Sequence, residues 1–200
     1  KINQIIGRLA EANGLKGVID QADFNSDEKL GRGKEKVDRL TKLIAIYENP
    51  ALDFSSNRAE GDDLLGDAYE YLIGNFAKDS GKSKGNFFTP SEVSRIMAKV
   101  IGISAETKRS QTIYDPTGGS GSLILKGADE APNGLTIYMQ EKDNTTAGLA
   151  RMNMILHNQP TAEIWNDNTL TNPYFKEKDG SLKTFDFGVS NPPFSDKAWR

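Results

Sequence analysis

The sequence predicts an α/β fold in which a helical N-terminal region precedes a layered domain built on a parallel sheet. In the N-terminal region, apolar residues recur at the three- and four-residue spacing of amphipathic helices. Later, four short segments rich in β-branched and aromatic residues alternate with helical stretches. Strands that alternate with helices form parallel βαβ units. The expected regions are 1–108 (helical) and 109–200 (α/β), with strands at 111–115, 135–141, 161–166 and 184–190.

The helical region contains two segments with a clear apolar face. Segment 36–47 places Val37, Ile44 and Tyr47 on one side, and segment 61–77 repeats the pattern. Packing against other parts of the protein is the expected role of both faces.

A third helix is expected to begin at Thr89. Threonine suits an N-cap, Pro90 suits the first helical position, and Glu92 would complete a capping box. In this helix Ile96, Met97 and Val100 are expected to face the core; Met97 and Val100 lie one helical turn apart. Further helices are expected at 122–130 and 143–157.

Composition excludes several classes of function. The net charge is −3, from 25 basic and 28 acidic residues. Because a protein that binds DNA alone is more often basic, DNA binding would need a local patch or a partner chain. The absence of cysteine excludes disulfides and thiolate catalysis, and a single histidine, His157, argues against a metal site. No apolar run is long enough to span a membrane and no signal peptide is recognisable, so a cytoplasmic location is expected.

A glycine-rich turn follows the first strand, in the sequence "DPTGGSGS" from Asp115. Glycines allow the backbone to approach a ligand closely, and the helix that follows offers free N–H groups. Glu141 ends the second strand, twenty residues after Gly121, where a carboxylate can accept hydrogen bonds from ribose hydroxyls. A dinucleotide and S-adenosylmethionine both fit this pair. The carboxylate of Asp115 favours S-adenosylmethionine, because it would repel a pyrophosphate and attract an ammonium group.

The fourth strand ends in "SNPPF", residues 190–194. If the strand order is 3-2-1-4, this segment leaves the sheet beside the glycine-rich turn, at the topological switch point where ligands bind in such sheets. Prolines restrict φ and have no N–H. The side-chain oxygen of Asn191 and the carbonyl of Pro192 can then accept two hydrogens from one amino group. Phe194 offers a flat surface for stacking.

These motifs together resemble the adenine-N6 DNA methyltransferases. The stretch from about 60 to 200, with "FFTP", "DPTGGSG", "RMNMILHN" and "NPPFSDKAW", is similar to the modification subunit of type I restriction–modification systems. The resemblance implies a Rossmann-like S-adenosylmethionine-dependent methyltransferase domain, truncated after its fourth strand, preceded by an N-terminal helical domain. The residues that match the family's catalytic tetrapeptide are Asn191, Pro192, Pro193 and Phe194. The residues that match its cofactor-binding positions are Phe88, Thr89, Pro90, Asp115, Gly119, Gly121, Glu141 and Asp167.

The resemblance also implies a reaction and partners. The expected reaction is transfer of a methyl group from S-adenosylmethionine to the N6 amino group of a flipped-out adenine in DNA, without a metal. The expected partners are DNA, a specificity subunit, a restriction subunit and a second modification subunit. Gly118 departs from the family, in which cysteine is common at this position, so a looser turn is expected.

Two other functions remain open from the sequence alone. A methyltransferase that acts on a protein glutamine amide also uses an Asn-Pro-Pro segment, usually followed by tyrosine. A non-catalytic role in assembly or cofactor binding is the second alternative.

Overall fold

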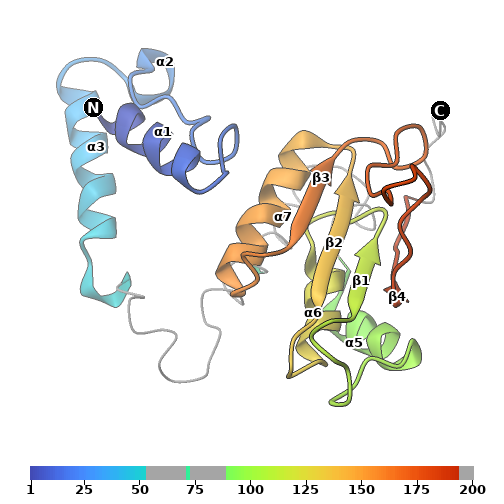
Figure 1. Cartoon of the computed structure of the whole chain (residues 1–200). Coiled ribbons are helices and arrows are strands. Elements are labelled where there is room, and N and C mark those ends of the chain that lie inside the picture. Colours follow the sequence, from blue (N-terminus) through green and yellow to red (C-terminus); the bar gives the residue numbers. More distant parts are fainter. Residues whose placement is uncertain (53–70, 73–88, 194–200) are drawn as a thin grey trace. The chain divides into compact units, whose positions relative to one another are not determined.

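The computed structural model describes residues 1–52, 71–72 and 89–193 (Figure 1). Its contacts divide the chain into two compact units, Lys1–Leu65 and Gly66–Arg200. Segment 36–47 is a helix, as expected, whereas most of segment 61–77 lies outside the described residues. Within the described parts of the chain, no helix combines the length and apolarity that crossing a membrane requires.

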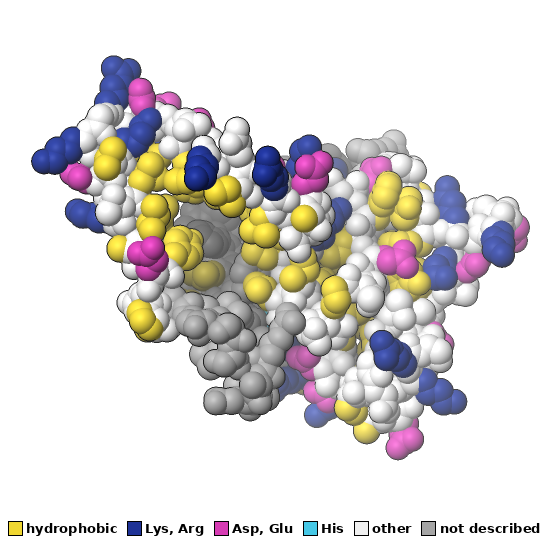
Figure 2. All heavy atoms as spheres, turned by 60° about the vertical axis from the view of Figure 1, so that its left-hand side comes forward, with side chains coloured by type: hydrophobic (Ala, Val, Ile, Leu, Met, Phe, Trp, Pro, Cys, Tyr) yellow, Lys and Arg dark blue, Asp and Glu magenta, His cyan; other side chains and the backbone are white. Residues whose placement is uncertain are grey.

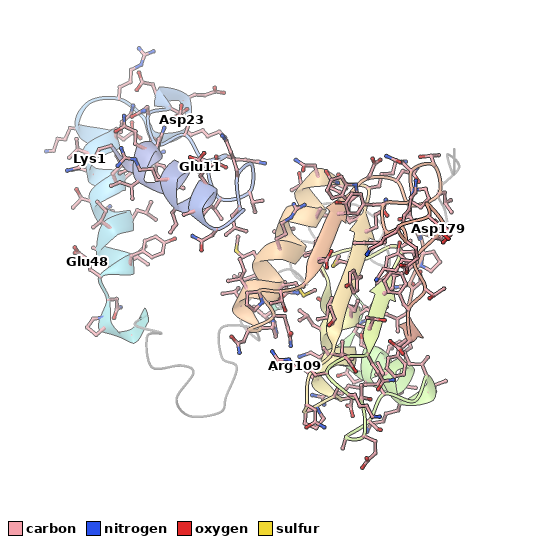
Figure 3. The ribbon with its side chains drawn as sticks, viewed as in Figure 1. Lys1, Glu11, Asp23, Glu48, Arg109 and Asp179 are labelled. Atoms are coloured by element: carbon pink, nitrogen blue, oxygen red, sulfur yellow. The ribbon has the colours of Figure 1, made fainter. Side chains whose placement is uncertain are left out.

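The N-terminal unit consists of short helices with little buried apolar surface. Among its described residues, Ala10 and Leu15 are the buried hydrophobic side chains. Asn3 links the first helix to a following loop, since its amide nitrogen donates to Asp23 (2.7 Å) and its oxygen accepts from the backbone N–H of Phe24 (3.0 Å; Figure 3). The described elements are α1 (Ile2–Ala12), α2 (Asp27–Leu30), α3 (Lys34–Tyr47) and the 3₁₀ helix η1 (Pro50–Leu52).

The apolar face predicted on segment 36–47 is largely exposed among the described residues. Val37, Ile44 and Tyr47 on α3 are 61%, 47% and 75% exposed. Ile5 and Leu9 on α1 are exposed as well, and Figure 2 shows hydrophobic side chains at the surface of this unit. The amphipathic spacing therefore predicted the helix correctly, but the described residues do not include a partner that buries its face.

The second unit contains a four-stranded parallel sheet in the order β3-β2-β1-β4, which is the order that a placement of residues 190–194 beside the glycine-rich turn requires. Two right-handed βαβ connections lead from β1 through β2 to β3, and β4 returns to the opposite side of β1 (Figure 1). The switch point therefore lies between β1 and β4. The elements are α5 (Ser91–Val100), β1 (Thr112–Asp115), α6 (Ser122–Asp129), β2 (Thr136–Glu141), α7 (Asn144–Leu156), β3 (Glu163–Asn166) and β4 (Phe187–Gly188).

One face of the sheet forms the main core. Ile113 and Ile137 are adjacent in register and fully or almost fully buried, and they pack with α6 and α7. Alternation of side chains along the strands explains why these residues share one face. Almost every residue of α6 is buried, including Ile124 and Leu125 at 0% exposure, because α5 covers the side of α6 that the sheet does not. Burial of each large apolar side chain, such as Ile124 or Leu125, stabilises the fold by about 1.5–3 kcal/mol.

The other face of the sheet is aromatic. Tyr114 and Tyr138 are paired across β1 and β2 and point away from the two isoleucines. Tyr114 stacks on Phe185 with ring centroids 4.5 Å apart, and Phe175 meets Tyr138 edge-on at 5.2 Å. The long connection between β3 and β4 therefore covers this face. Asp179, at the tip of a turn in this connection, accepts hydrogen bonds from Ser181 (Figure 3).

Helix α5 differs from the prediction in its start and in its buried face. Pro90, not Thr89, is the N-cap, and no side chain caps the helix, so the capping box is absent. Ile96 and Val100 are 63% and 79% exposed, which makes their expected core position wrong. The buried face instead contains the small residues Ser94 and Ala98, with Met97 packed at its edge. Small residues allow α5 to approach α6 closely.

The contact-based units do not coincide with the regions 1–108 and 109–200. Because α5 packs against α6, it belongs to the same compact unit as the sheet. As a division of the protein into functional domains, the boundary at residue 108 stays a prediction.

Candidate active site

The cofactor turn, residues 115–121, connects the end of β1 to the start of α6. Gly119 and Gly121 both have positive φ, 56° and 81°, and Gly121 is the N-cap of α6. A side chain at these positions would be strained, so the sequence needs glycine there. The backbone N–H of Gly118 donates to the carbonyl of Gln140 (3.0 Å), which fixes the turn to the end of β2.

Asp115 lies at the base of this turn and is 1% exposed. Its Oδ1 accepts hydrogen bonds from the backbone N–H of Thr117 (2.9 Å) and from the Thr117 hydroxyl (3.3 Å). Burial raises the pKa of Asp115 to about 7, the hydrogen bonds from Thr117 oppose that rise, and the nearby Glu141 carboxylate adds to it. A carboxyl with this pKa would become fully ionised beside a cationic group.

Glu141 faces the same turn from the end of β2. Its Oε2 accepts from the backbone N–H of Gly119 (2.9 Å) and its Oε1 accepts from the N–H of Asp143 (2.7 Å). Desolvation raises the pKa of Glu141, and these two backbone hydrogen bonds act in the opposite direction. A carboxylate can accept about four hydrogen bonds, so it retains capacity for hydroxyl groups.

Asp167 follows β3 and begins a loop, residues 167–174. This loop lies against the cofactor turn and against β2. The Asp167 carboxylate accepts from the N–H of Asn168 and the amide of Asn172, each at 2.7 Å. The hydroxyl of Thr169 donates to the carbonyl of Pro116 (2.6 Å), which joins this loop to the cofactor turn.

The NPPF segment, residues 191–194, begins next to the cofactor turn. The N–H of Val189 donates to the carbonyl of Tyr114 (3.0 Å), continuing the pairing of β4 with β1. The hydroxyls of Ser190 and Thr117 are then 2.8 Å apart. The amide nitrogen of Asn191 donates to the hydroxyl of Thr89 (3.2 Å), which directly precedes α5 and is 8% exposed.

The described parts of the predicted site are thus joined by hydrogen bonds. Gly119 bonds to Glu141, Thr89 bonds to Asn191, and Asp115 bonds to Thr117, whose hydroxyl contacts Ser190. The backbone carbonyl of Asp167 accepts from Gln140 on β2, and Thr169 joins the same loop to Pro116. Phe88 and Phe194 lie outside the described residues. The remaining predicted positions are Pro90, exposed before α5; Gly121, buried; and Pro192 and Pro193, both half-buried.

Gly118 is buried in a space that a neighbouring side chain fills. A Cβ added there would lie 2.0 Å from Met139 Cε and 3.1 Å from Met139 Cβ. Gly118 bonds to Gln140 through its N–H and accepts from Gly121 through its carbonyl (2.9 Å), and the expectation of a looser turn stays a prediction. The Met139 side chain fills the volume that a side chain at Gly118 would need.

Several residues that the sequence analysis missed hold these segments together. Gln140 is fully buried; its amide nitrogen donates to the carbonyls of Asn172 (2.9 Å) and Asp167 (3.3 Å), and its oxygen accepts from the N–H of Tyr174 (3.1 Å). Asn153 on α7 is also fully buried and donates to the carbonyl of Ser120 (3.0 Å). The available signal was a large amide inside an otherwise apolar strand or helix, since such a group needs buried partners.

In residues 1–52, 71–72 and 89–193, no group of three or more histidine, aspartate or glutamate side chains is placed to hold a metal ion.

A family model described as N-6 DNA Methylase matches residues 60–200. The chain belongs to the N-6 DNA Methylase family. The matched residues include the whole sheet, the cofactor turn and the NPPF segment.

Individual proteins agree with the family match. The type I restriction enzyme MpnII methylase subunit of Mycoplasma pneumoniae is 37% identical over 201 residues, which cover 94% of this chain and 35% of the relative. The crystal structure of a type I restriction-modification system methyltransferase subunit from Streptococcus thermophilus has a TM-score of 0.80 at 32% identity, covering 98% of this chain and 41% of that one. The chain therefore spans about a third of the length of the curated relatives it matches.

The fold itself is shared more widely. A putative class I S-adenosylmethionine-dependent methyltransferase from Listeria monocytogenes has a TM-score of 0.56 at 14% identity, over 94% of this chain and 58% of that one. The predicted Rossmann-like methyltransferase fold and the resemblance to type I modification subunits are confirmed.

Proposed function

We propose that the protein containing this chain transfers a methyl group from S-adenosylmethionine to the N6 amino group of adenine in DNA, as the modification subunit of a type I restriction–modification enzyme. The observation that supports this most directly is the 2.8 Å contact between the hydroxyls of Thr117 and Ser190. It brings the NPPF segment to the turn that holds a buried carboxyl, so a methyl donor and an amino group can meet there.

The residues around the cofactor turn fit S-adenosylmethionine. The donor carries an electrophilic methyl group on a sulfonium and has no phosphate. Asp115 can pair with its ammonium group, directly or through water, and Glu141 can accept hydrogen bonds from its ribose hydroxyls. Asp167 lies on the loop that contacts the turn through Thr169 and can bind near the adenine ring of the donor.

The NPPF segment fits the acceptor amino group. The Asn191 amide nitrogen donates a hydrogen bond to Thr89. The Asn191 amide oxygen is therefore the atom that would accept a hydrogen from the adenine N6 group. The carbonyl of Pro192 would accept the second hydrogen. Holding both hydrogens reduces delocalisation of the nitrogen lone pair into the ring and directs it at the methyl group. The nitrogen gains the methyl group as the bond between the sulfonium sulfur and the methyl carbon breaks, S-adenosylhomocysteine leaves, and the nitrogen loses one proton to solvent.

The target base must leave the duplex before it can reach these acceptors. Base flipping costs a few kcal/mol, and stacking on an aromatic side chain offsets part of this cost. Phe194 is the residue of the NPPF segment with that capacity. Correct alignment of donor and acceptor can then contribute about 7–11 kcal/mol to catalysis.

We assign target recognition to partner subunits. The net charge of −3 does not suit a chain that binds DNA alone. The proposed assembly contains DNA, a specificity subunit, a second modification subunit and, for cleavage, a restriction subunit. Its proposed location is the cytoplasm.

The decisive variant is Asn191→Ala in the full-length protein. Methyl transfer to DNA should become undetectable because one of the two acceptors is lost, whereas the affinity for S-adenosylmethionine should stay within about twofold, which is under 0.5 kcal/mol. The measurements are transfer of labelled methyl groups to duplex DNA in the presence of the specificity subunit, and calorimetry with the cofactor.

Asn133→Ala is the matched control, because Asn133 is exposed and its amide bonds to the carbonyl of Ala105, away from the cofactor turn. It should retain full activity. Loss of cofactor binding in Asn191→Ala, or labelling of protein instead of DNA by the wild type, would contradict the proposal.

A further inference from the structure

Between the cofactor turn and the NPPF segment, three side chains form a continuous polar line. The Thr117 hydroxyl is 3.3 Å from Asp115 Oδ1 and 2.8 Å from the Ser190 hydroxyl. The N–H of Thr117 also donates to the same carboxyl oxygen (2.9 Å). Asp115 is fully enclosed, so this line starts from a fixed point in the core.

The line lies where the backbone pairing of β1 and β4 stops. The registered pairs are Ile113 with Phe187 and Tyr114 with Gly188, and the N–H of Val189 makes the next hydrogen bond to Tyr114. Beyond it, Pro192 and Pro193 have no N–H to donate. At Ser190, immediately before Asn191, a side-chain hydrogen bond therefore replaces the backbone hydrogen bonds that connect the two strands.

We infer that Thr117 and Ser190 are positioning residues for the methyl transfer: the hydrogen bond between their hydroxyls sets the distance and direction of Asn191 relative to the cofactor turn. The inference rests on the proposed function, in which Asn191 holds the acceptor nitrogen. Neither hydroxyl touches the reacting atoms. When Thr117 donates to Asp115, its oxygen accepts from Ser190, so a single hydroxyl serves both ends of the line.

A second threonine provides an internal control. At the other end of β1, the hydroxyl of Thr112 is 2.8 Å from Asp186 Oδ2, just before β4. This contact joins the same two strands over a separation of 74 residues, whereas Thr117 and Ser190 are 73 residues apart. The two contacts have similar geometry and similar loop length, but only the one at Thr117 adjoins the NPPF segment.

The test compares Thr117→Val, Thr117→Ser, Ser190→Ala and the control Thr112→Val in the full-length protein with its specificity subunit. Thr117→Val and Ser190→Ala should each lower kcat about 10- to 100-fold, because a displacement of about 1 Å can cost 100-fold in rate. The KM for S-adenosylmethionine should change less than about threefold, and the double variant should be no worse than about twofold below either single variant, since both remove the same bond. Thr117→Ser should recover kcat to within about threefold of the wild type, and Thr112→Val should leave kcat unchanged.

Hydrogen exchange gives a readout that does not depend on turnover. Thr117→Val should accelerate exchange at the amides of Val189, Ser190 and Asn191, whereas Thr112→Val should act near Asp186, whose N–H bonds to the Thr112 hydroxyl (3.1 Å). An unchanged kcat in Thr117→Val, equal defects in Thr117→Ser and Thr117→Val, or unchanged exchange at residues 189–191 would each overturn the inference. If the wild type transfers no methyl group to DNA, the proposed function fails, and the exchange data still decide whether the hydroxyl pair holds the NPPF segment.

Discussion

The surroundings of the Asp115 carboxyl group favour its neutral form when no cation is bound beside it. It is buried, its pKa is raised to about 7 chiefly by desolvation, and the negative charge of Glu141 adds to the effect. An ammonium group beside it would favour the ionised form. The proton on Asp115 is therefore linked to binding of the cofactor that we propose, and this link makes stability and pH dependence informative at the scale of one residue.

The first consequence concerns folding stability. The pKa of Asp115 rises from 3.8 in the unfolded chain to about 7 in the folded chain. Between these values the folded state binds more protons, so the free energy of unfolding should fall as pH rises from 4 to 7, by at most about 1.4 kcal/mol per pH unit. Asp115→Asn should remove this slope. Urea unfolding of both proteins at pH 5, 6, 7 and 8 measures it.

The stability of Asp115→Asn relative to the wild type should therefore increase from pH 5 to pH 7 and then level off. Asp129→Asn is a suitable control, because Asp129 is exposed at the end of α6. Parallel curves for the wild type and Asp115→Asn over this range would show that the buried carboxyl does not titrate there.

At the scale of an element, hydrogen bonds from the sheet hold the 167–174 loop in place. Gln140, fully buried on β2, makes three hydrogen bonds to its backbone, and Thr169 makes one to the cofactor turn. Trp165 on β3 stacks on Tyr174, the last residue of this loop, with ring centroids 3.6 Å apart and planes within 7° of parallel. The position of Asp167 depends on these contacts.

Gln140→Leu removes the three hydrogen bonds and leaves backbone groups of the loop without their buried partner. The free energy of unfolding should fall by about 2–4 kcal/mol, and the affinity for S-adenosylmethionine should fall at least about tenfold because Asp167 loses its support. Thermal unfolding and calorimetry measure the two effects. Gln21→Leu, an exposed glutamine of the N-terminal unit, should change neither. Wild-type cofactor affinity in Gln140→Leu would show that the loop keeps its position without this side chain.

The elements of the α/β unit could be predicted because local pattern determines them. The β-branched and aromatic residues along 111–115 and 135–141 placed β1 and β2 within a residue of their observed bounds, and parallel strands alternating with helices were correctly expected. The face of α5 could not be read from spacing, since Ser94 and Ala98 are buried for close approach to α6 and not for their hydrophobicity.

The candidate site divides in the same way. Asp115, Glu141 and Asn191 stand at strand ends, where topology brings them together, so motifs were sufficient to find them. The contacts that fix them are long-range pairs of ordinary hydroxyls and amides, such as Thr117 with Ser190 and Asn191 with Thr89. Nothing in the local sequence distinguishes these polar residues from exposed ones, because their partners lie 73 and 102 positions away.

At the scale of the whole molecule, the two compact units differ in how much they bury. In the described part of the α/β unit, sixteen apolar side chains are buried, whereas the described part of the N-terminal unit buries Ala10 and Leu15. Local stability follows the burial of apolar groups around backbone hydrogen bonds.

The 200-residue chain should therefore show uneven protection from hydrogen exchange. Amides in the middle of α3 should exchange at least about 100-fold faster than those of Ile113 and Ile137, since opening of α3 exposes little additional apolar surface. Mass spectrometry of deuterated fragments measures the difference. Equal protection would mean that the exposed side of α3 is covered in solution, for example by a second copy of the chain, and repeating the measurement at several protein concentrations would detect that.

The pairing of β1 with β4 sets an order of events during synthesis. Strands β1, β2 and β3 and helices α6 and α7 can assemble as soon as residue 166 has left the ribosome. The pairing of Ile113 with Phe187 can form only after β4 has been synthesised. Because distant segments pay the entropy of loop closure before they gain contacts, β4 should be the last strand to join. A nascent chain would therefore form the turn at 115–121, with its contact to Glu141, before Ser190 and Asn191 could reach that turn.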